Sequence, residues 1–94
     1  MRSYELMTIF RPGMAEPEVR TEVSTIEQAL TAAGAEIKAT DFWGKRRFAY
    51  EIEHLSEGYY ALVTFEADAG AVNDVDRALS LSDNVLRHKF IRPE

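Results

Sequence analysis

Hydrophobic and polar positions divide this chain into segments with two different periods. In residues 59–67 apolar side chains alternate with more polar ones, which is typical of a strand with one buried face. In residues 17–33 the apolar positions recur at spacings of three and four, which places them on one stripe of a helix. These positions are Val19, Val23, Ile26, Leu30 and Ala33. Gly34 then supplies a stop signal, so the pattern predicts a helix that ends there.

The same patterns predict six elements in the order strand, helix, strand, strand, helix, strand. The third segment is one long strand that bends at Trp43-Gly44, since an isolated Gly within a strand pattern usually marks a bulge. The predicted residues are 4–10, 17–33, 35–42 with 46–52, 59–67, 72–81 and 85–92, with a turn at 54–58. Each of the two helices has an apolar stripe that must be buried, and one face of a four-stranded sheet can bury both. The predicted fold class is therefore α+β, a ferredoxin-like βαββαβ sandwich with a four-stranded antiparallel sheet and two helices on one face, and residues 1–94 form a single domain.

Period two also predicts which side chains face the helices and which face away. The helix-covered set is Tyr59, Ala61, Val63, Phe65, Leu86, His88 and Phe90. The uncovered set is Met7, Ile9, Tyr60, Leu62, Thr64, Val85, Arg87, Lys89 and Ile91. His88 is expected to be a partly buried side chain without a ligand or catalytic role. Contiguous apolar residues on an uncovered face favour an interaction surface, although scattered surface hydrophobic residues are also common.

The distribution of charge qualifies the acidic character of the chain. A net charge of −5 argues against a general electrostatic nucleic-acid binder. Six of the eleven Lys and Arg residues nevertheless lie in residues 45–47 and 87–92. The stretch "GKRRFAY" is either a solvated bend, with Phe48 and Tyr50 returning to the core, or a phosphate clamp beside which Trp43 offers a stacking surface to an RNA base.

The sequence does not carry the residues that catalysis or metal binding requires. It has no cysteine, and its two histidines, His54 and His88, lack the spacing of a metal site. Phosphate-loop and nucleophile motifs are missing, and Glu51 and Glu53 are expected to be solvated acids. We therefore expect no enzyme activity, metal, cofactor or small-molecule substrate. The sequence contains no long apolar segment and no secretory signal. We therefore expect a cytoplasmic location and no association with a membrane.

Three separated motifs resemble one family. "GKRRFAYEI" (44–52) resembles the signature of the bacterial small-ribosomal-subunit protein six, "RALSLSDNVLRHK" (77–89) resembles its second recurrent stretch, and "MRSYELM" is similar to its typical opening. The turn "SEGYY" (56–60) also fits, and the resemblance covers nearly the whole chain in the same order. Phe48 stands where the family usually has Leu, and many relatives carry a polar tail longer than the "RPE" seen here.

The resemblance implies a structural, non-catalytic constituent of the small ribosomal subunit in the cytoplasm. Family members bind the central domain of the small-subunit (16S) ribosomal RNA together with small-subunit protein eighteen. Matching positions imply RNA or partner contacts for Arg2, Arg46, Arg47, Arg87 and Lys89. Among these residues, Arg87 and Arg2 are the first to be assigned such a contact. Arg46 and Arg47 point to opposite faces of their strand, so one of the two is expected to make contact. The partner-facing apolar residues are then Met7, Ile9, Tyr60 and Leu62.

A small-molecule-sensing domain is the alternative function, because regulatory amino-acid-binding domains share the βαββαβ frame. A sensor has no need for the Lys-Arg-Arg run or the paired motifs, and a thermal-shift panel of amino acids and nucleotides would distinguish the two. An acylphosphatase-like enzyme is disfavoured, because "RPGMAEP" stands where an Arg-bearing phosphate loop would follow the first strand.

Overall fold

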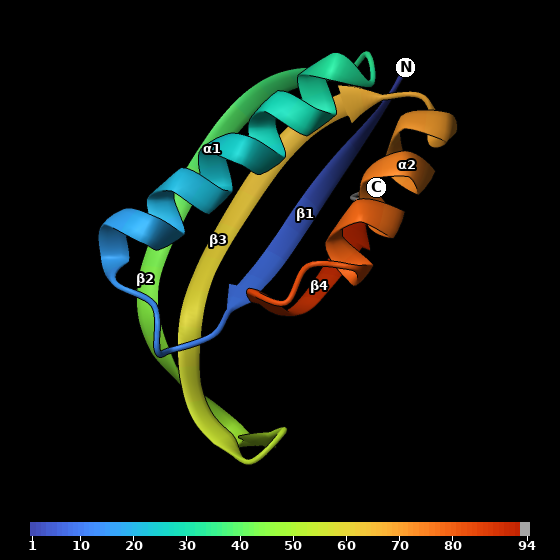
Figure 1. The fold of residues 1–94 in the computed structure, drawn as a ribbon. Helices are drawn as coiled ribbons and strands as arrows, with labels where there is room; N and C mark the ends of the chain where they lie inside the picture. Colours follow the sequence, from blue (N-terminus) through green and yellow to red (C-terminus); the bar gives the residue numbers. More distant parts are fainter. Residues whose placement is uncertain (93–94) are drawn as a thin grey trace.

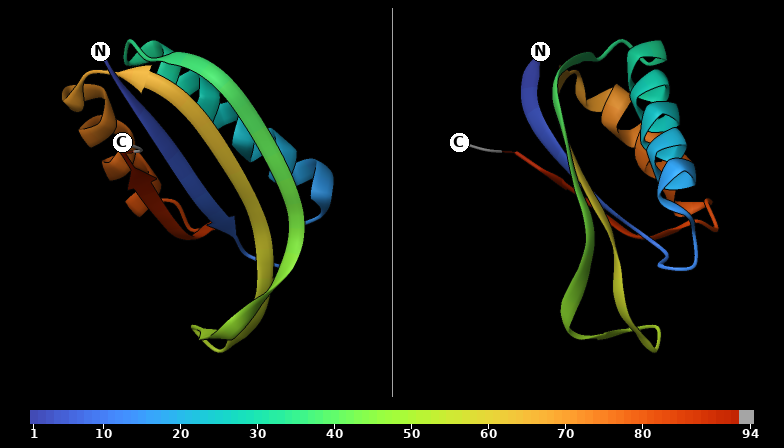
Figure 2. Two further views of the ribbon diagram at one scale, coloured as in Figure 1. Left: turned by 180° about the vertical axis from the view of Figure 1, so that it is seen from behind. Right: turned by 90° about the vertical axis from the view of Figure 1, so that its left-hand side faces the viewer.

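In the computed structural model, which describes residues 1–92, the six predicted elements follow one another in the predicted order. They are β1 (Arg2–Phe10), α1 (Glu16–Ala32), β2 (Glu36–Ile52), β3 (Leu55–Ala67), α2 (Ala69–Ser80) and β4 (Val85–Ile91). The strands form one antiparallel sheet in the order β2-β3-β1-β4. Both helices cover the same face of this sheet, and the other face has no helix on it within residues 1–92 (Figures 1 and 2). The predicted ferredoxin-like α+β fold is confirmed.

The apolar stripe of α1 explains why this segment is a helix. Its residues Val19, Val23, Ile26 and Leu30 are all buried against the sheet. At the start of the helix, the carboxylate of Glu18 accepts a hydrogen bond from the backbone N–H of Ala15 at 2.9 Å. At its end Gly34 takes a positive φ of 99°, a conformation that glycine adopts without steric cost.

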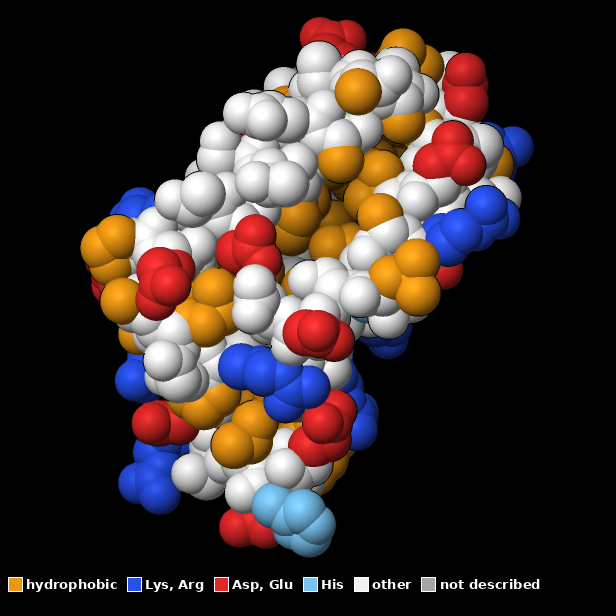
Figure 3. Space-filling model, in the orientation of Figure 1, with side chains coloured by type: hydrophobic (Ala, Val, Ile, Leu, Met, Phe, Trp, Pro, Cys, Tyr) orange, Lys and Arg blue, Asp and Glu red, His pale blue; other side chains and the backbone are white. Residues whose placement is uncertain are grey.

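The core lies between the helices and the two central strands, β1 and β3. Alternate residues of each strand are buried, as period two predicted. The most deeply buried large side chains from these strands are Leu6, Phe10, Val63 and Phe65. Between the helices a hydrophobic hollow of about 120 Å³ opens over this core (Figure 3). The helix layer therefore leaves part of the apolar interior visible from outside.

Two predicted element starts differ from the observed ones by three residues or more. The turn predicted at 54–58 is a two-residue turn formed by Glu53 and His54, whose φ angles are 51° and 66°. Ile52 pairs with Leu55 across this turn, so residues 55–58 already belong to β3. The second helix begins at Ala69, ahead of the predicted range. Its first turn consists of small residues, and one of them, Ala71, extends the buried stripe of Val75 and Leu79.

The sheet contains several register shifts, and two of them bear on the predicted alternation of side chains. In β2 the register shifts between Phe42 and Gly44, and Gly44 has a φ of 82°, which confirms the predicted bend. Another shift lies opposite the end of β1, where Phe10 pairs with Val85 and Ile9 with Arg87. Because of this second bulge, Val85 packs against the core instead of facing away from the helices. The placement of Val85 on the uncovered face was wrong.

Candidate nucleic-acid interface

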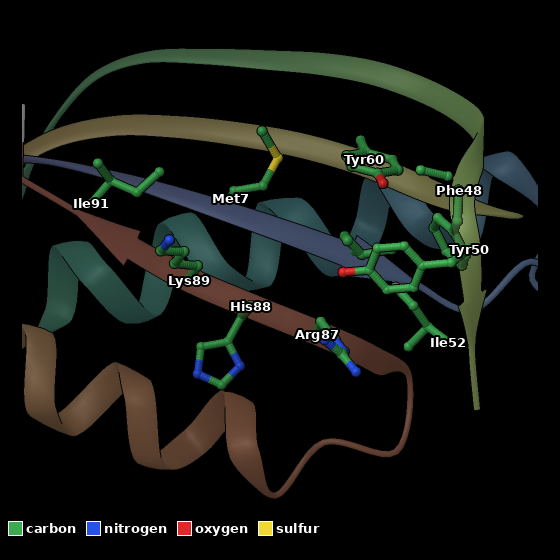
Figure 4. Close-up of a pocket in the computed structure, with 11 residues that line it drawn as sticks. Met7, Phe48, Tyr50, Ile52, Tyr60, Arg87, His88, Lys89 and Ile91 are labelled. Atoms are coloured by element: carbon green, nitrogen blue, oxygen red, sulfur yellow. The ribbon is translucent and has the colours of Figure 1, made fainter.

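The uncovered face contains a groove of about 510 Å³, called the sheet groove below (Figure 4). Its floor is formed by Met7 and Ile9 of β1 and Tyr60 of β3. The side chains that form its two walls come from β4 and from the far half of the β2–β3 hairpin, which extends beyond the helix layer (Figures 1 and 2). They are Arg87, Lys89 and Ile91 on one side and Phe48, Tyr50 and Ile52 on the other.

Gly58 allows the hairpin to approach the sheet closely. A Cβ atom at this position would lie 2.8 Å from the carbonyl oxygen of Phe10 and 3.0 Å from the ring of Phe48. The Phe48 ring packs edge-on against Tyr60, with centroids 6.1 Å apart, and the Tyr50 side chain is 72% exposed. If residues 45–47 were only a solvated bend, Phe48 and Tyr50 were expected to return to the core. They do not, since both line the sheet groove.

A second aromatic group lies beside the groove on the same face. The rings of Trp43 and Tyr60 are stacked, with centroids 6.0 Å apart and 10° between their planes. The indole Nε1 of Trp43 donates a hydrogen bond to Asp41 Oδ2 at 3.0 Å. The Arg46 guanidinium lies 6.0 Å from the centroid of the Trp43 ring, and its Nε donates to the Trp43 carbonyl oxygen. Trp43, Asp41 and Arg46 thus form one fixed cluster next to Tyr60.

Most cations outside the candidate set are neutralised by a carboxylate. Arg11, Arg20, Lys38 and Lys45 each form an ion pair, at N–O distances of 2.9 to 3.9 Å. The hydrogen bond from Lys38 to Glu36, together with the charge of Glu36, raises the pKa of Lys38. Within residues 1–92, no ion pair is formed by any candidate cation, namely Arg2, Arg46, Arg47, Arg87 and Lys89. Their charges therefore remain uncompensated by the carboxylates that the structure describes.

Strand pairing assigns the neighbouring cations of β2 to opposite faces. Arg46 pairs with Gly58, which shares the uncovered face with Tyr60, while Arg47 pairs with Glu57 and points the other way. Arg46 is accordingly the cation of the two that lies on the face of the sheet groove.

The structure does not bring Arg2 next to Arg87. Arg87 pairs with Ile9 near one end of β1, whereas Arg2 pairs with Ala67 at the other end. At about 3.3 Å per residue these ends of β1 are roughly 23 Å apart. Arg2 also shares the strand parity of the buried Tyr4, so it belongs to a different part of the surface.

Leu62 lies on the uncovered face beside Met7, with which it pairs, but outside the lining of the groove.

Sequence reasoning did not select Phe48, Tyr50 or Ile52 for this face. Their period-two spacing after the bend was the available signal, because it places all three on one side of the strand.

His88 faces the helices, as predicted. Its Nε2 lies 2.6 Å from Oδ1 of Asp76 on α2, and its side chain is 15% exposed (Figure 4). No group of three His, Cys, Asp or Glu residues in the described part of the chain could hold a metal ion. Neither α1 nor α2 combines the length and the apolar character that crossing a bilayer requires.

Comparisons with known proteins agree with this geometry. The sequence profile of the family described as Ribosomal protein S6 matches residues 3–92. Among solved structures, the chain is similar to the 30S ribosomal protein S6 from Thermotoga maritima, with 26% sequence identity and a TM-score of 0.94. The match covers 98% of this chain and 87% of the Thermotoga chain.

Proposed function

The chain belongs to the ribosomal protein S6 family, and from this premise we propose that its uncovered sheet face binds the central domain of the small-subunit ribosomal RNA together with small-subunit protein eighteen. As a member of this family it is a non-catalytic, structural constituent of the small (30S) subunit of the cytoplasmic ribosome and associates with the RNA of that subunit. This membership decides against the sensor and acylphosphatase alternatives.

The apolar residues of the uncovered face support a protein partner. Met7, Ile9 and Tyr60 form the floor of the sheet groove, and Leu62 continues the apolar surface beside Met7. A contiguous apolar patch with charged residues at its rim is typical of a protein–protein interface. We assign this patch to protein eighteen.

The uncompensated cations around the groove are the observation that carries the RNA assignment. Arg87 and Lys89 stand on one wall, and Arg46 lies beyond the opposite wall on the same face. Cations without carboxylate partners are free to contact phosphate oxygens, and arginine can do so through two parallel hydrogen bonds. Arg47 and Arg2 lie outside this face and are proposed as flanking contacts. A net charge of −5 implies that the partner protein supplies much of the positive potential.

A gel-shift titration on a central-domain RNA fragment, with and without protein eighteen, tests this proposal. We expect weak binding by the chain alone and tight, salt-sensitive binding by the two proteins together, because counterions are released as phosphates are contacted. Equal affinity with and without protein eighteen would refute the partnership. Absence of binding in both titrations would refute the RNA assignment as well.

A further inference from the structure

We propose that the exposed face of the Trp43 ring is a stacking platform for one unpaired base of the bound RNA. The inference rests on the proposed function and deepens it, because it names a single-stranded nucleotide as the ligand of a specific side chain. The observations that carry it are the fixed orientation of the ring, its exposure and the uncompensated cation beside it.

Two contacts and an adjacent bulge hold the Trp43 ring in place before any ligand binds. One ring face stacks on Tyr60, the indole N–H donates to Asp41, and the adjacent bulge at Gly44 sets the path of the backbone. A side chain that is already ordered loses little rotamer entropy on binding. Because its only polar atom already has an acceptor, the part of Trp43 left for a ligand is its aromatic face.

The fold does not need Trp43 as a core residue. The side chain is not part of the buried cluster between the helices and the sheet, and the residue is 38% exposed. A plain surface role, in which Trp43 only shields Tyr60, would account for the stacking of the two rings. It would not make use of the charge of Arg46, whose guanidinium lies over the ring at 6.0 Å from its centroid and forms no ion pair within residues 1–92.

The pairing of an aromatic face with an arginine that forms no ion pair in the described residues matches single-stranded RNA better than a protein segment. Bases of unpaired nucleotides stack on aromatic side chains, while arginines contact the phosphates on either side. Trp43 also lies outside the lining of the sheet groove, where an apolar segment of a protein would be buried. The cluster of Trp43, Asp41 and Arg46 therefore forms a site separate from the apolar floor.

Trp43 is the single tryptophan of the chain, so its fluorescence reports directly on the proposed contact. The chain and protein eighteen are titrated with the central-domain RNA fragment, and a parallel titration with Trp43→Phe serves as the blank for emission from protein eighteen. We expect the emission of Trp43 to be quenched as RNA binds. Quenching by protein eighteen before RNA is added would overturn the inference, since it would assign Trp43 to the protein partner.

Two substitutions separate stacking from packing. Trp43→Leu keeps an apolar cover over Tyr60 but removes the aromatic face, whereas Trp43→Phe keeps a smaller face. Loss of one stacked base is expected to weaken RNA binding about 10-fold to 100-fold in Trp43→Leu, and Trp43→Phe should lose less. Thermal unfolding of both variants checks that each is folded under the binding conditions.

The outcomes distinguish this inference from the proposed function. If the wild-type complex binds RNA while Trp43 emission stays constant and Trp43→Leu binds as tightly as wild type, the stacking platform is refuted and the proposed function stands. If the wild-type complex does not bind the RNA fragment, the proposed function fails and the inference fails with it.

Discussion

At the scale of single residues, Gly58 sets the shape of the uncovered face. It is buried within β3, and the backbone of β1 and the ring of Phe48 approach it more closely than a Cβ atom would permit. The neighbouring atom nearest to that Cβ position is a backbone carbonyl oxygen, which cannot move without disturbing the sheet. The absence of a side chain at this position therefore allows the hairpin to wall the sheet groove.

Gly58→Ala should destabilise the fold by about 1–3 kcal/mol, because overpacking of a tight site forces backbone shifts. Chemical denaturation monitored by circular dichroism measures the change as a lower midpoint. Gly70→Ala is the matched control: no atom lies within 4 Å of its added Cβ, and Ala is the better helix former, so its midpoint should not fall. Equal midpoints for Gly58→Ala and wild type would contradict the close approach.

At the scale of elements, the β2–β3 hairpin shows what periodicity can and cannot predict. The two strands and their bend followed from alternating side chains and from an isolated glycine. The turn was misplaced because "SEG" has the composition of a turn, whereas the chain actually reverses at Glu53 and His54. Glu seldom adopts positive φ, and His adopts it more often than most residues but far less often than Gly, so the local signal was weak.

Bulges limited the prediction of the site in a similar way. One extra residue moved Val85 to the core face, and only the observed register reveals it. The cations themselves could be selected from the sequence, but the distance between Arg2 and Arg87 depends on how β1 pairs with both neighbours.

His54→Gly should stabilise the hairpin by about 1 kcal/mol. Both turn residues occupy the left-handed region, where a side chain costs energy and glycine does not. Ser56→Gly is the control, because position 56 lies within β3, where glycine weakens a strand. The two variants should shift the thermal midpoint in opposite directions, and a lower midpoint for His54→Gly would show that its φ angle carries no strain.

At the scale of the whole molecule, cations without ion pairs gather around the sheet groove, whereas carboxylates lie on both faces of the sheet. Carboxylates are frequent on the helices, with Glu16, Glu18, Glu22 and Glu27 on α1 and Asp74 and Asp76 on α2. The uncovered face carries carboxylates as well, namely Glu5, Asp41 and Glu66. It also carries Arg46, Arg87 and Lys89, which form no ion pair within the described residues. An acidic protein can therefore approach RNA with the cations that surround its groove, although the face as a whole is not basic.

Arg87→Ala and Arg46→Ala should each lower the affinity of the ternary complex and reduce its salt slope by about one unit, since each loses one phosphate contact. Arg2→Ala tests by the same measure whether contact extends to the far end of β1. Arg77→Ala is the control, because this arginine lies in the last turn of α2 on the opposite face. Wild-type slopes for both Arg87→Ala and Arg46→Ala would exclude these side chains from the RNA contact.

The sheet order also has a consequence for how the chain folds during its own synthesis. β1 is made first yet lies between β3 and β4, and its pairing with β4 joins Glu5 to Ile91. Until residues 85–91 have been translated, one edge of β1 has no neighbour, and unpaired strand edges invite association with other chains. Closing such a distant pair also costs more loop entropy than closing a local one, which slows folding. The nascent chain thus stays open to misassociation through one edge of β1 in the interval between the completion of β3 and the arrival of β4.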